Sequence, residues 1–363
     1  MRLGVEWALV EGDLVRGDVE ITDGRISAVG LNGHPGKGIA APGFVDLQVN
    51  GFGGVDFFSA DAHAYARAGE ALLETGVTAY QPTLITASED ELRAALGEVP
   101  PNGAAPHVLG AHLEGPFLAP ERLGTHPAGD RRDPDVAFLE CLLAAGPVAH
   151  MTLAPELPGA LDLVDLLRAR GVTVACGHSN ATAEEARRAF DRGARTVTHI
   201  FNAMRPFEAR EPGLAGAALA CEDVAVQVIL DGVHLADDTA RLVWRAAAGR
   251  MALVTDAVSG AGVGDGDGSY RLGSVEVEIE NGVVRRADSV LAGSTVTMIE
   301  AVRNLVELGA PLAGALSAAS EVPARVAGRS DVGSLRPGAT ADVVVLDDSL
   351  QIQRVLAAGE DEL

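Results

Sequence analysis

Three residues in the middle of the sequence carry side chains that commonly bind catalytic metal ions. Glu114, His178 and His199 each lie at the end of an apolar segment, and small residues flank both histidines. Two imidazoles and one carboxylate form the ligand set of a catalytic zinc that keeps an open position for water, and iron, manganese and cobalt accept similar donors. We therefore predict one divalent ion per chain, with zinc as the first choice.

An aspartate at the end of another apolar segment is suited to acid–base chemistry beside such an ion. Asp256 follows the apolar run that begins at Met251. At that place a carboxylate can take a proton from water and return it to a leaving group. The alternative roles are a helix cap and a partner for backbone amides.

Two histidines and one arginine are weaker candidates. His126 follows Gly124-Thr125, and His234 follows Asp231-Gly-Val; either histidine can stabilise a developing oxyanion or bind a sugar hydroxyl. Arg210 lies in a Gly-rich segment, where a guanidinium can bind a phosphate through two hydrogen bonds. Each of the three can instead be an ordinary surface residue. We treat His112, two residues before Glu114, as structural.

Eight apolar segments alternate with helix-like segments through the middle of the chain. Strands that are apolar on both faces are typical of parallel sheets covered by helices. Eight such units favour a (β/α)8 barrel over an open sheet, and catalytic groups of that fold lie where its strands end. The predicted strands are residues 44–50, 77–85, 107–115, 148–156, 172–179, 196–202, 224–234 and 251–257.

The two ends of the chain are β-rich and are predicted to meet in one small sheet domain. An Asp23-Gly24 turn between alternating segments indicates a hairpin, and a second hairpin is predicted to turn at Asn281-Gly282. The predicted division assigns residues 1–41 and 336–363 to the small domain and residues 42–335 to the barrel, with a hairpin insertion near residues 270–290.

Charge and composition exclude several classes of partner. The chain holds 51 Asp and Glu against 28 Lys and Arg, a formal net charge of −23, which repels phosphate backbones, so we expect no nucleic-acid partner. No apolar run reaches the ~18 residues of a membrane span, and Glu6 interrupts the apolar stretch where a signal peptide would lie. Three widely spaced cysteines form no disulfide framework. We expect a soluble, cytoplasmic protein without a membrane partner.

Nine short segments, taken together and in order, resemble the N-acetylglucosamine-6-phosphate deacetylases of the amidohydrolase superfamily. The first is PGFVDLQVNGFGG (42–54) and the last is LAGSTVTM (291–298), so the resemblance runs through most of the chain. Between them lie HLEGPFL (112–118), GTHPAG (124–129), GHSNAT (177–182), THIFNAM (198–204), REPGLAGA (210–217), DGVH (231–234) and LVTDA (253–257).

The resemblance implies hydrolysis of the acetamide of N-acetylglucosamine 6-phosphate in amino-sugar metabolism, by a distorted barrel with a small terminal β-sandwich. It assigns the metal to Glu114, His178 and His199, and the catalytic acid–base role to Asp256. It also implies a homodimer in which Arg210 reaches the phosphate of the neighbouring site. The residues that match substrate contacts are Thr125, His126, Asn202, Ala203, Arg210, Asp231, His234, Leu291, Ala292 and Gly293.

One pair of residues departs from the wider superfamily, in which many members carry His-x-His on the first barrel strand. Gln48 and Asn50 stand there instead. Amides are poor zinc ligands beside imidazole, so we expect one ion rather than two. The fourth strand ends in Ala154-Pro155-Glu156, without a lysine to bridge two metals, which argues against a binuclear cyclic-amide hydrolase. Another amidohydrolase, a deaminase and a non-catalytic barrel scaffold remain as alternatives.

Overall fold

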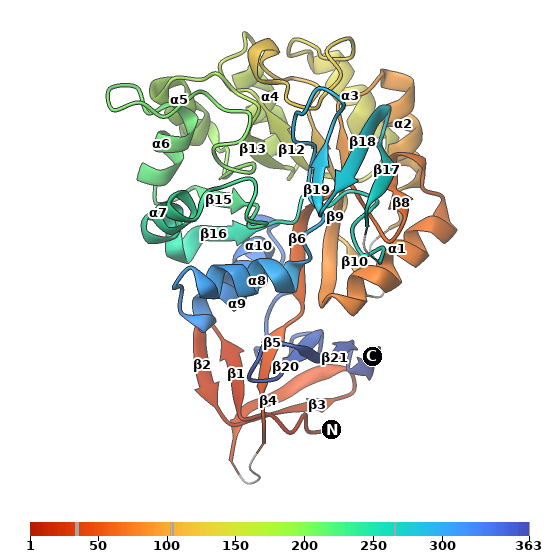
Figure 1. Cartoon of the computed structure of the whole chain (residues 1–363), viewed down its shortest axis with the longest axis vertical. Helices are drawn as coiled ribbons and strands as arrows, with labels where there is room; N and C mark the ends of the chain where they lie inside the picture. Colours follow the sequence, from red (N-terminus) through yellow and green to blue (C-terminus); the bar gives the residue numbers. More distant parts are fainter. Residues whose placement is uncertain (33–35, 102, 104, 265, 363) are drawn as a thin grey trace.

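The chain folds into a nearly closed barrel of parallel strands with a smaller sheet beneath it (Figure 1). The structure is a computed structural model that describes residues 1–362, except 33–35, 102, 104 and 265. Asp256 N–H donates to the Gln48 carbonyl at 2.9 Å and brings the last strand back to the first. The predicted fold class is confirmed. The barrel strands are β6 (Phe44–Val49), β9 (Val77–Ile85), β11 (Ala111–Glu114), β12 (Val148–Leu153), β13 (Thr173–Cys176), β14 (Thr196–Val197), β15 (Ala225–Val228) and β16 (Met251–Leu253).

Most barrel strands are shorter than the sequence predicts, and only β9 keeps its predicted bounds. The predicted strand 107–115 is two strands, β10 (His107–Val108) and β11, because the chain turns at Gly110 with φ +92°. β14 and β15 end at Val197 and Val228, well before the predicted ends. The apolar residues beyond these strands are buried in loops over the barrel rather than in the sheet, so apolar character alone overestimates strand length.

Helices cover the outside of the barrel and bury one continuous apolar core. Side-chain caps begin several of them. Capping boxes at Ser88, Thr182 and Thr297 begin α2, α5 and α8. None of the described helices is long and apolar enough to cross a bilayer. The helices are α1 (Ala62–Glu74), α2 (Glu89–Glu98), α3 (Val136–Ala145), α4 (Ala160–Ala169), α5 (Ala183–Arg192), α6 (Gly213–Ala220), α7 (Asp237–Ala247), α8 (Met298–Glu307), α9 (Leu312–Ala319) and α10 (Glu321–Val326).

The small domain joins strands from both ends of the chain, and both termini lie in it (Figure 1). β5 pairs in parallel with β1 and antiparallel with β20, so N-terminal and C-terminal strands share one sheet. β3 and β4 form the hairpin predicted at Asp23-Gly24, where both turn residues have positive φ. The exact domain boundaries stay a prediction. The strands are β1 (Trp7–Val10), β2 (Asp13–Arg16), β3 (Asp18–Thr22), β4 (Arg25–Leu31), β5 (Ile39–Pro42), β20 (Val343–Leu346), β21 (Ile352–Ala357) and β22 (Glu360–Asp361).

The insertion after β16 is a three-stranded sheet rather than a lone hairpin. β17 (Gly268–Leu272) pairs with β18 (Val275–Glu280), which pairs with β19 (Val283–Arg285) across the predicted Asn281-Gly282 turn. The sheet has its own small apolar cluster, to which Leu272 and Val284 belong. It stands beside the barrel mouth in Figure 1.

Polar side chains occupy the barrel interior beneath the mouth. His112, treated as structural, is fully buried between the hydroxyls of Thr83 and Thr152 and stacks on His150. Burial lowers the pKa of His112 to about 4, so the ring stays neutral.

Near the closure, a buried carboxylate ties β6 to the segment after β16. Asp46 accepts hydrogen bonds from Thr255 N–H at 3.2 Å and from Thr255 Oγ1 at 2.6 Å. Burial raises the pKa of Asp46 to about 7, against the lowering effect of these hydrogen bonds. The pair holds the backbone immediately before Asp256.

Replacing Thr255 tests this closure. Thr255→Val keeps the shape of the side chain but leaves Asp46 without its hydroxyl donor, so we expect the free energy of unfolding to fall by about 1–3 kcal/mol. Thr255→Ser keeps the hydroxyl and should retain most of the stability. Urea unfolding of the three proteins measures the difference, and equal stability of the valine and serine variants would contradict this role.

Candidate functional site

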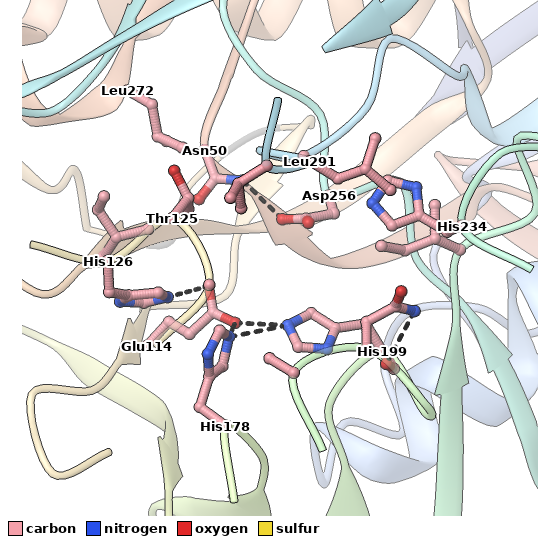
Figure 2. A pocket seen from close by; sticks show the side chains of 17 residues that line it. Asn50, Glu114, Thr125, His126, His178, His199, His234, Asp256, Leu272 and Leu291 are labelled. Carbon is pink, nitrogen blue, oxygen red and sulfur yellow. Dashed lines mark hydrogen bonds and ion pairs between the residues drawn. The ribbon is translucent and has the colours of Figure 1, made fainter. Parts of the chain in front are cut away.

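A cavity of about 230 Å³ opens at the carboxyl ends of the barrel strands (Figure 2). Glu114 is the last residue of β11, and His178 and His199 each stand two residues beyond the ends of β13 and β14. The fold therefore brings together residues that are up to 85 positions apart in the chain. The lining residues are Asn50, Ile85, Glu114, Gly124, Thr125, His126, His178, His199, Asn202, Ala203, Ile229, His234, Asp256, Leu272, Val290, Leu291 and Gly293.

The three residues predicted to bind metal converge on one point. Glu114 Oε1 lies 3.1 Å from His178 Nε2 and 2.8 Å from His199 Nε2, and the two nitrogens are 3.2 Å apart. A tetrahedral ion with bonds of ~2.0 Å has ligand-to-ligand edges of roughly 3.3 Å. The three separations therefore fit a small divalent ion bound by these atoms.

The hydrogen bond on the far side of His178 supports the same conclusion. His178 Nδ1–H donates to the Arg122 carbonyl at 2.9 Å, because a carbonyl can only accept. The neutral ring then has a lone pair on Nε2, which faces the oxygen of Glu114 and the second nitrogen. A hydrogen bond of this kind fixes the tautomer of metal-binding histidines and raises their basicity. An ion between these atoms would accept a lone pair from each of them.

The electrostatics of Glu114 favour its charged form. Burial by itself raises the pKa of Glu114, but contacts with His126, His178 and His199 outweigh burial and hold the pKa well below its usual range. Burial likewise lowers the pKa of His199, and the Glu114 carboxylate more than restores it. The site therefore contains a buried carboxylate that stays ionised, as a metal ligand must.

Asp256 faces the ligand set across the cavity and is held by an amide (Figure 2). Asn50 Nδ2 donates to Asp256 Oδ1 at 2.7 Å. Burial and the charge of Glu114 raise the pKa of Asp256 to about 6, while His199, His234 and Asn50 act in the opposite direction. A carboxyl group with this pKa can both accept and donate a proton near neutral pH.

Asn50 is the site residue whose contact the sequence reasoning missed. By residue type alone, Asn50 is only a poor metal ligand. Its place at the end of β6, two residues beyond Gln48, was the available signal, because alternate residues of a strand share a face. Gln48 lies deeper, fully buried, and its amide has no hydrogen-bond partner within the described part of the chain.

His126 enters the cavity as a neutral donor. Its Nδ1 accepts from Thr86 N–H at 3.2 Å and lies 2.9 Å from Thr86 Oγ1. A backbone N–H can only donate, so the ring proton is on Nε2, which lies 3.7 Å from Glu114 Oε2. Burial, with the nearby His178, lowers the pKa of His126 to about 4.

His234 is arranged differently, with a carboxylate beside its ring. Its Nδ1 lies 2.7 Å from Asp231 Oδ2. Asp231 also accepts from the backbone N–H groups of Val233 and His234. Burial raises the pKa of Asp231, yet the contacts with His234 lower it overall. Because Asp231 binds Nδ1–H, the other nitrogen is available to the cavity.

The backbone at these positions is strained. His178, His199, Ala203 and Asp256 have φ values of +48°, +28°, +48° and +51°, in the region that residues other than glycine seldom adopt. Gly293 lies against the backbone of Asp256. A Cβ on Gly293 would lie 2.6 Å from the Asp256 carbonyl oxygen, so this glycine permits the close approach of the two loops.

Most of the residues predicted to contact substrate line the cavity, but three do not. Asp231 lies behind His234, and Ala292 is buried in the apolar cluster of the insertion. Arg210 is exposed in the loop after β14, outside the lining. Arg122, Glu156 and Asn180, which the sequence reasoning did not select, stand around His178. No periodic pattern marks such loop residues.

Comparison with known proteins places the chain among metal-dependent hydrolases. Residues 39–361 match the model of the amidohydrolase family. N-acetylglucosamine-6-phosphate deacetylase of Mus musculus is 38% identical over 343 residues, which is 90% of this chain and 83% of that protein. N-acetylgalactosamine-6-phosphate deacetylase of Escherichia coli O157:H7 is 36% identical and is aligned over 96% of both chains.

A solved structure extends the similarity to the whole fold. It is an aspartate-to-alanine variant of N-acetyl-D-glucosamine-6-phosphate deacetylase from Mycobacterium smegmatis, in complex with N-acetyl-D-glucosamine 6-phosphate. The two chains superpose with a TM-score of 0.92 at 36% identity, over 100% of this chain and 99% of the other.

Metal binding should stabilise the folded chain, because unfolding separates the three ligands. At a free zinc concentration 100 times Kd, the free energy of unfolding should rise by about 2.7 kcal/mol. Unfolding of chelator-treated protein with and without zinc measures the gain. His199→Gln should lose it, whereas His63→Gln, on the exposed face of α1, should keep it. An equal gain in both variants would mean that zinc binds elsewhere.

Proposed function

The chain belongs to the amidohydrolase family, in the group of the N-acetylglucosamine-6-phosphate deacetylases, and we propose that it hydrolyses the acetamide of N-acetylglucosamine 6-phosphate. The products are glucosamine 6-phosphate and acetate. The observation that carries the proposal is the meeting, in one cavity, of a carboxylate–histidine ligand set with Asp256, whose pKa is raised to about 6.

Glu114, His178 and His199 are the residues that would hold one divalent ion, with zinc the first choice. Such an ion supplies Lewis acidity toward water and toward the acetyl carbonyl. Asp256, as the carboxylate, accepts the proton that water loses when it attacks the carbonyl carbon. Asn50 keeps the carboxylate turned toward the cavity by donating to Oδ1 at 2.7 Å.

The same aspartate completes the reaction. An amine leaves poorly without a proton, and protonated Asp256 can donate one to the nitrogen as the carbon–nitrogen bond breaks. His126, a neutral Nε2–H donor, and His234, whose Nδ1 lies 2.7 Å from Asp231 Oδ2, are the candidate donors to the developing oxyanion.

Phosphate recognition requires a positive charge that the cavity lining does not supply. Among the lining residues that the structure describes, none is an arginine or lysine. Arg210 stands on an exposed loop together with Phe207, a large apolar side chain that is 55% exposed. An exposed arginine beside an exposed aromatic residue supports a homodimer in which Arg210 reaches the phosphate in the neighbouring subunit. The substrate and its products would belong to the cytoplasm.

The direct test is acetate release from N-acetylglucosamine 6-phosphate, with metal content measured on the same sample. One ion per active chain is expected, and two tightly held ions would return Gln48 and Asn50 to consideration. N-acetylgalactosamine 6-phosphate should be assayed in parallel, because a relative with 36% identity acts on that epimer by name. A cyclic amide and an aminopurine test the alternative amidohydrolase reactions. Turnover of the cyclic amide or the aminopurine, without turnover of either sugar phosphate, would overturn the proposal.

Replacing the acid–base residue should abolish most turnover without loss of the fold. Asp256→Asn can still accept from Asn50, but it cannot take a proton, so kcat should fall by at least ~10²-fold with little change in KM. Asp238→Asn, an exposed aspartate on α7, is the matched control.

The pH profile gives a second measurement on the same proteins. The carboxylate is the active form, so kcat/KM should fall tenfold per pH unit below its pKa. Without an ion that pKa is about 6, and a bound cation lowers it, so the acid limb should lie at or below pH 6. If Asp256→Asn keeps a near-normal kcat, or shows the same acid limb as the unaltered chain, Asp256 is not the acid–base residue.

The role of Arg210 can be separated from the role of its loop. A bidentate contact with phosphate is worth on the order of 1.5–3 kcal/mol, so Arg210→Ala should lower kcat/KM roughly 10- to 100-fold for the phosphorylated sugar. Hydrolysis of unphosphorylated N-acetylglucosamine should not change, and Arg210→Lys should recover part of the loss. Equal losses on both sugars would show that Arg210 only supports the loop.

Mixed subunits test whether Arg210 acts across a dimer. Arg210→Ala and Asp256→Asn chains are each impaired, but a dimer of one of each has one site with an intact Asp256 and a neighbour's Arg210. Mixing the two impaired proteins should therefore raise the activity above that of either one alone. No recovery, in a sample whose dimers exchange subunits, would contradict the arrangement.

A further inference from the structure

A half-buried carboxylate that the proposed reaction does not use stands in the loop after β12. Glu156 is not among the residues that line the cavity. Its Oε2 accepts from Ser179 Oγ at 2.8 Å, and its Oε1 accepts from Asn180 N–H at 2.5 Å. These two residues directly follow His178 in the sequence. Glu156 therefore holds the backbone on which His178 stands.

A second set of hydrogen bonds connects the same loop to the side chain of His178. Arg122 Nε and Nη2 donate to Asn180 Oδ1 at 3.2 and 3.0 Å. The carbonyl of Arg122 accepts from His178 Nδ1–H at 2.9 Å. These contacts form a closed cycle. It runs from the His178 imidazole through Arg122 to Asn180 and returns to His178 along the backbone.

This cycle of contacts stabilises a strained backbone conformation at His178. His178 has φ +48°, a conformation that persists only where the surrounding structure determines it. Its carbonyl accepts from Ala119 N–H at 3.0 Å, so the segment that carries Arg122 is bound to His178 on both sides. While these contacts hold, the imidazole of His178 cannot rotate independently of the His178 backbone.

The same segment continues into residues that face the cavity. Arg122 is followed within four residues by Thr125 and His126, both of which line the cavity, and His126 N–H donates to the Leu123 carbonyl at 3.1 Å. A shift of Arg122 would therefore move a metal ligand and two candidate substrate contacts together.

We propose that Arg122, Asn180 and Glu156 are positioning residues that clamp His178 in its metal-binding orientation and tie it to the loop of Thr125 and His126. This inference rests on the proposed metal site. Outer contacts of this kind typically change metal affinity ~10- to 100-fold when they are removed. We therefore expect a loss of metal affinity of that size when these residues are replaced, although none of them contacts the ion or the substrate.

A double-mutant cycle on the full-length protein tests the clamp. Asn180→Leu removes the acceptor, and Arg122→Met removes the guanidinium while the backbone carbonyl remains. Zinc affinity is measured by competition with a chelator, and the geometry is followed by the visible spectrum of the cobalt-loaded protein. Each single variant should weaken zinc binding ~10- to 100-fold and shift the cobalt spectrum. Both changes break the same contact, so the loss of zinc affinity in the double variant should be no larger than the loss in the more affected single variant.

Two further variants keep the test independent of general stability. Asn180→Asp preserves the oxygen that Arg122 binds and should keep the zinc affinity of the unaltered chain. Arg192→Met, which removes an exposed contact with Asp165 on the outer helices, should have no effect. Unfolding of the ion-free proteins shows whether a variant is folded.

The kinetic readout separates positioning from catalysis. In zinc-saturated Asn180→Leu, KM for the sugar phosphate should rise through the displaced Thr125 and His126, while the acid limb due to Asp256 stays in place. Unchanged zinc affinity in both single variants, or additive losses in the double variant, would overturn the clamp. If the unaltered chain itself binds no ion, the proposed function fails instead, so the two failures are distinguishable.

Discussion

Three electron-pair donors within 3.2 Å of one another repel unless a positive charge is shared among them, and the barrel is built to hold them at that distance. Glu114, His178 and His199 come from three different strands, so no local segment can bring them together. Their separations depend on the parallel register of β11, β13 and β14. Positive φ angles at both histidines then turn the side chains inward. The strain is tolerable because hydrogen bonds on the outer side of the loops fix each turn.

Burial acts on the two carboxylates of the cavity with opposite results. Both Glu114 and Asp256 are nearly inaccessible to water, which disfavours charge. Three imidazoles surround Glu114, and its pKa lies well below the usual range. Asp256 has one neutral amide donor and more distant histidines, and its pKa rises to about 6. The difference in partners separates a permanently ionised ligand from a group that can exchange protons, as in other active sites with paired carboxyl groups.

Features that depend on neighbouring residues in the sequence could be predicted, and features that depend on tertiary contacts could not. The turns at Asp23-Gly24 and Asn281-Gly282 follow from the positive φ that each position requires. The fold class follows from the alternation of apolar segments with helices, and the candidate ligands follow from polar residues at strand ends. The early ends of β14 and β15 depend on tertiary packing. The partners of Asn50 and Arg122 lie 206 and 58 residues away, so no local pattern reveals them.

The small domain has a consequence for the order in which the protein is made. β5 belongs to the first forty-two residues, but its antiparallel partner β20 begins at Val343. During translation the open edge of β5 leaves the ribosome before the whole barrel and has no partner until the final strands emerge. The last barrel strand ends at Leu253 and the last helix that covers the barrel ends at Val326, so the larger unit can form before β20 emerges. The unpaired edge of β5 is a place where nascent chains can associate with one another.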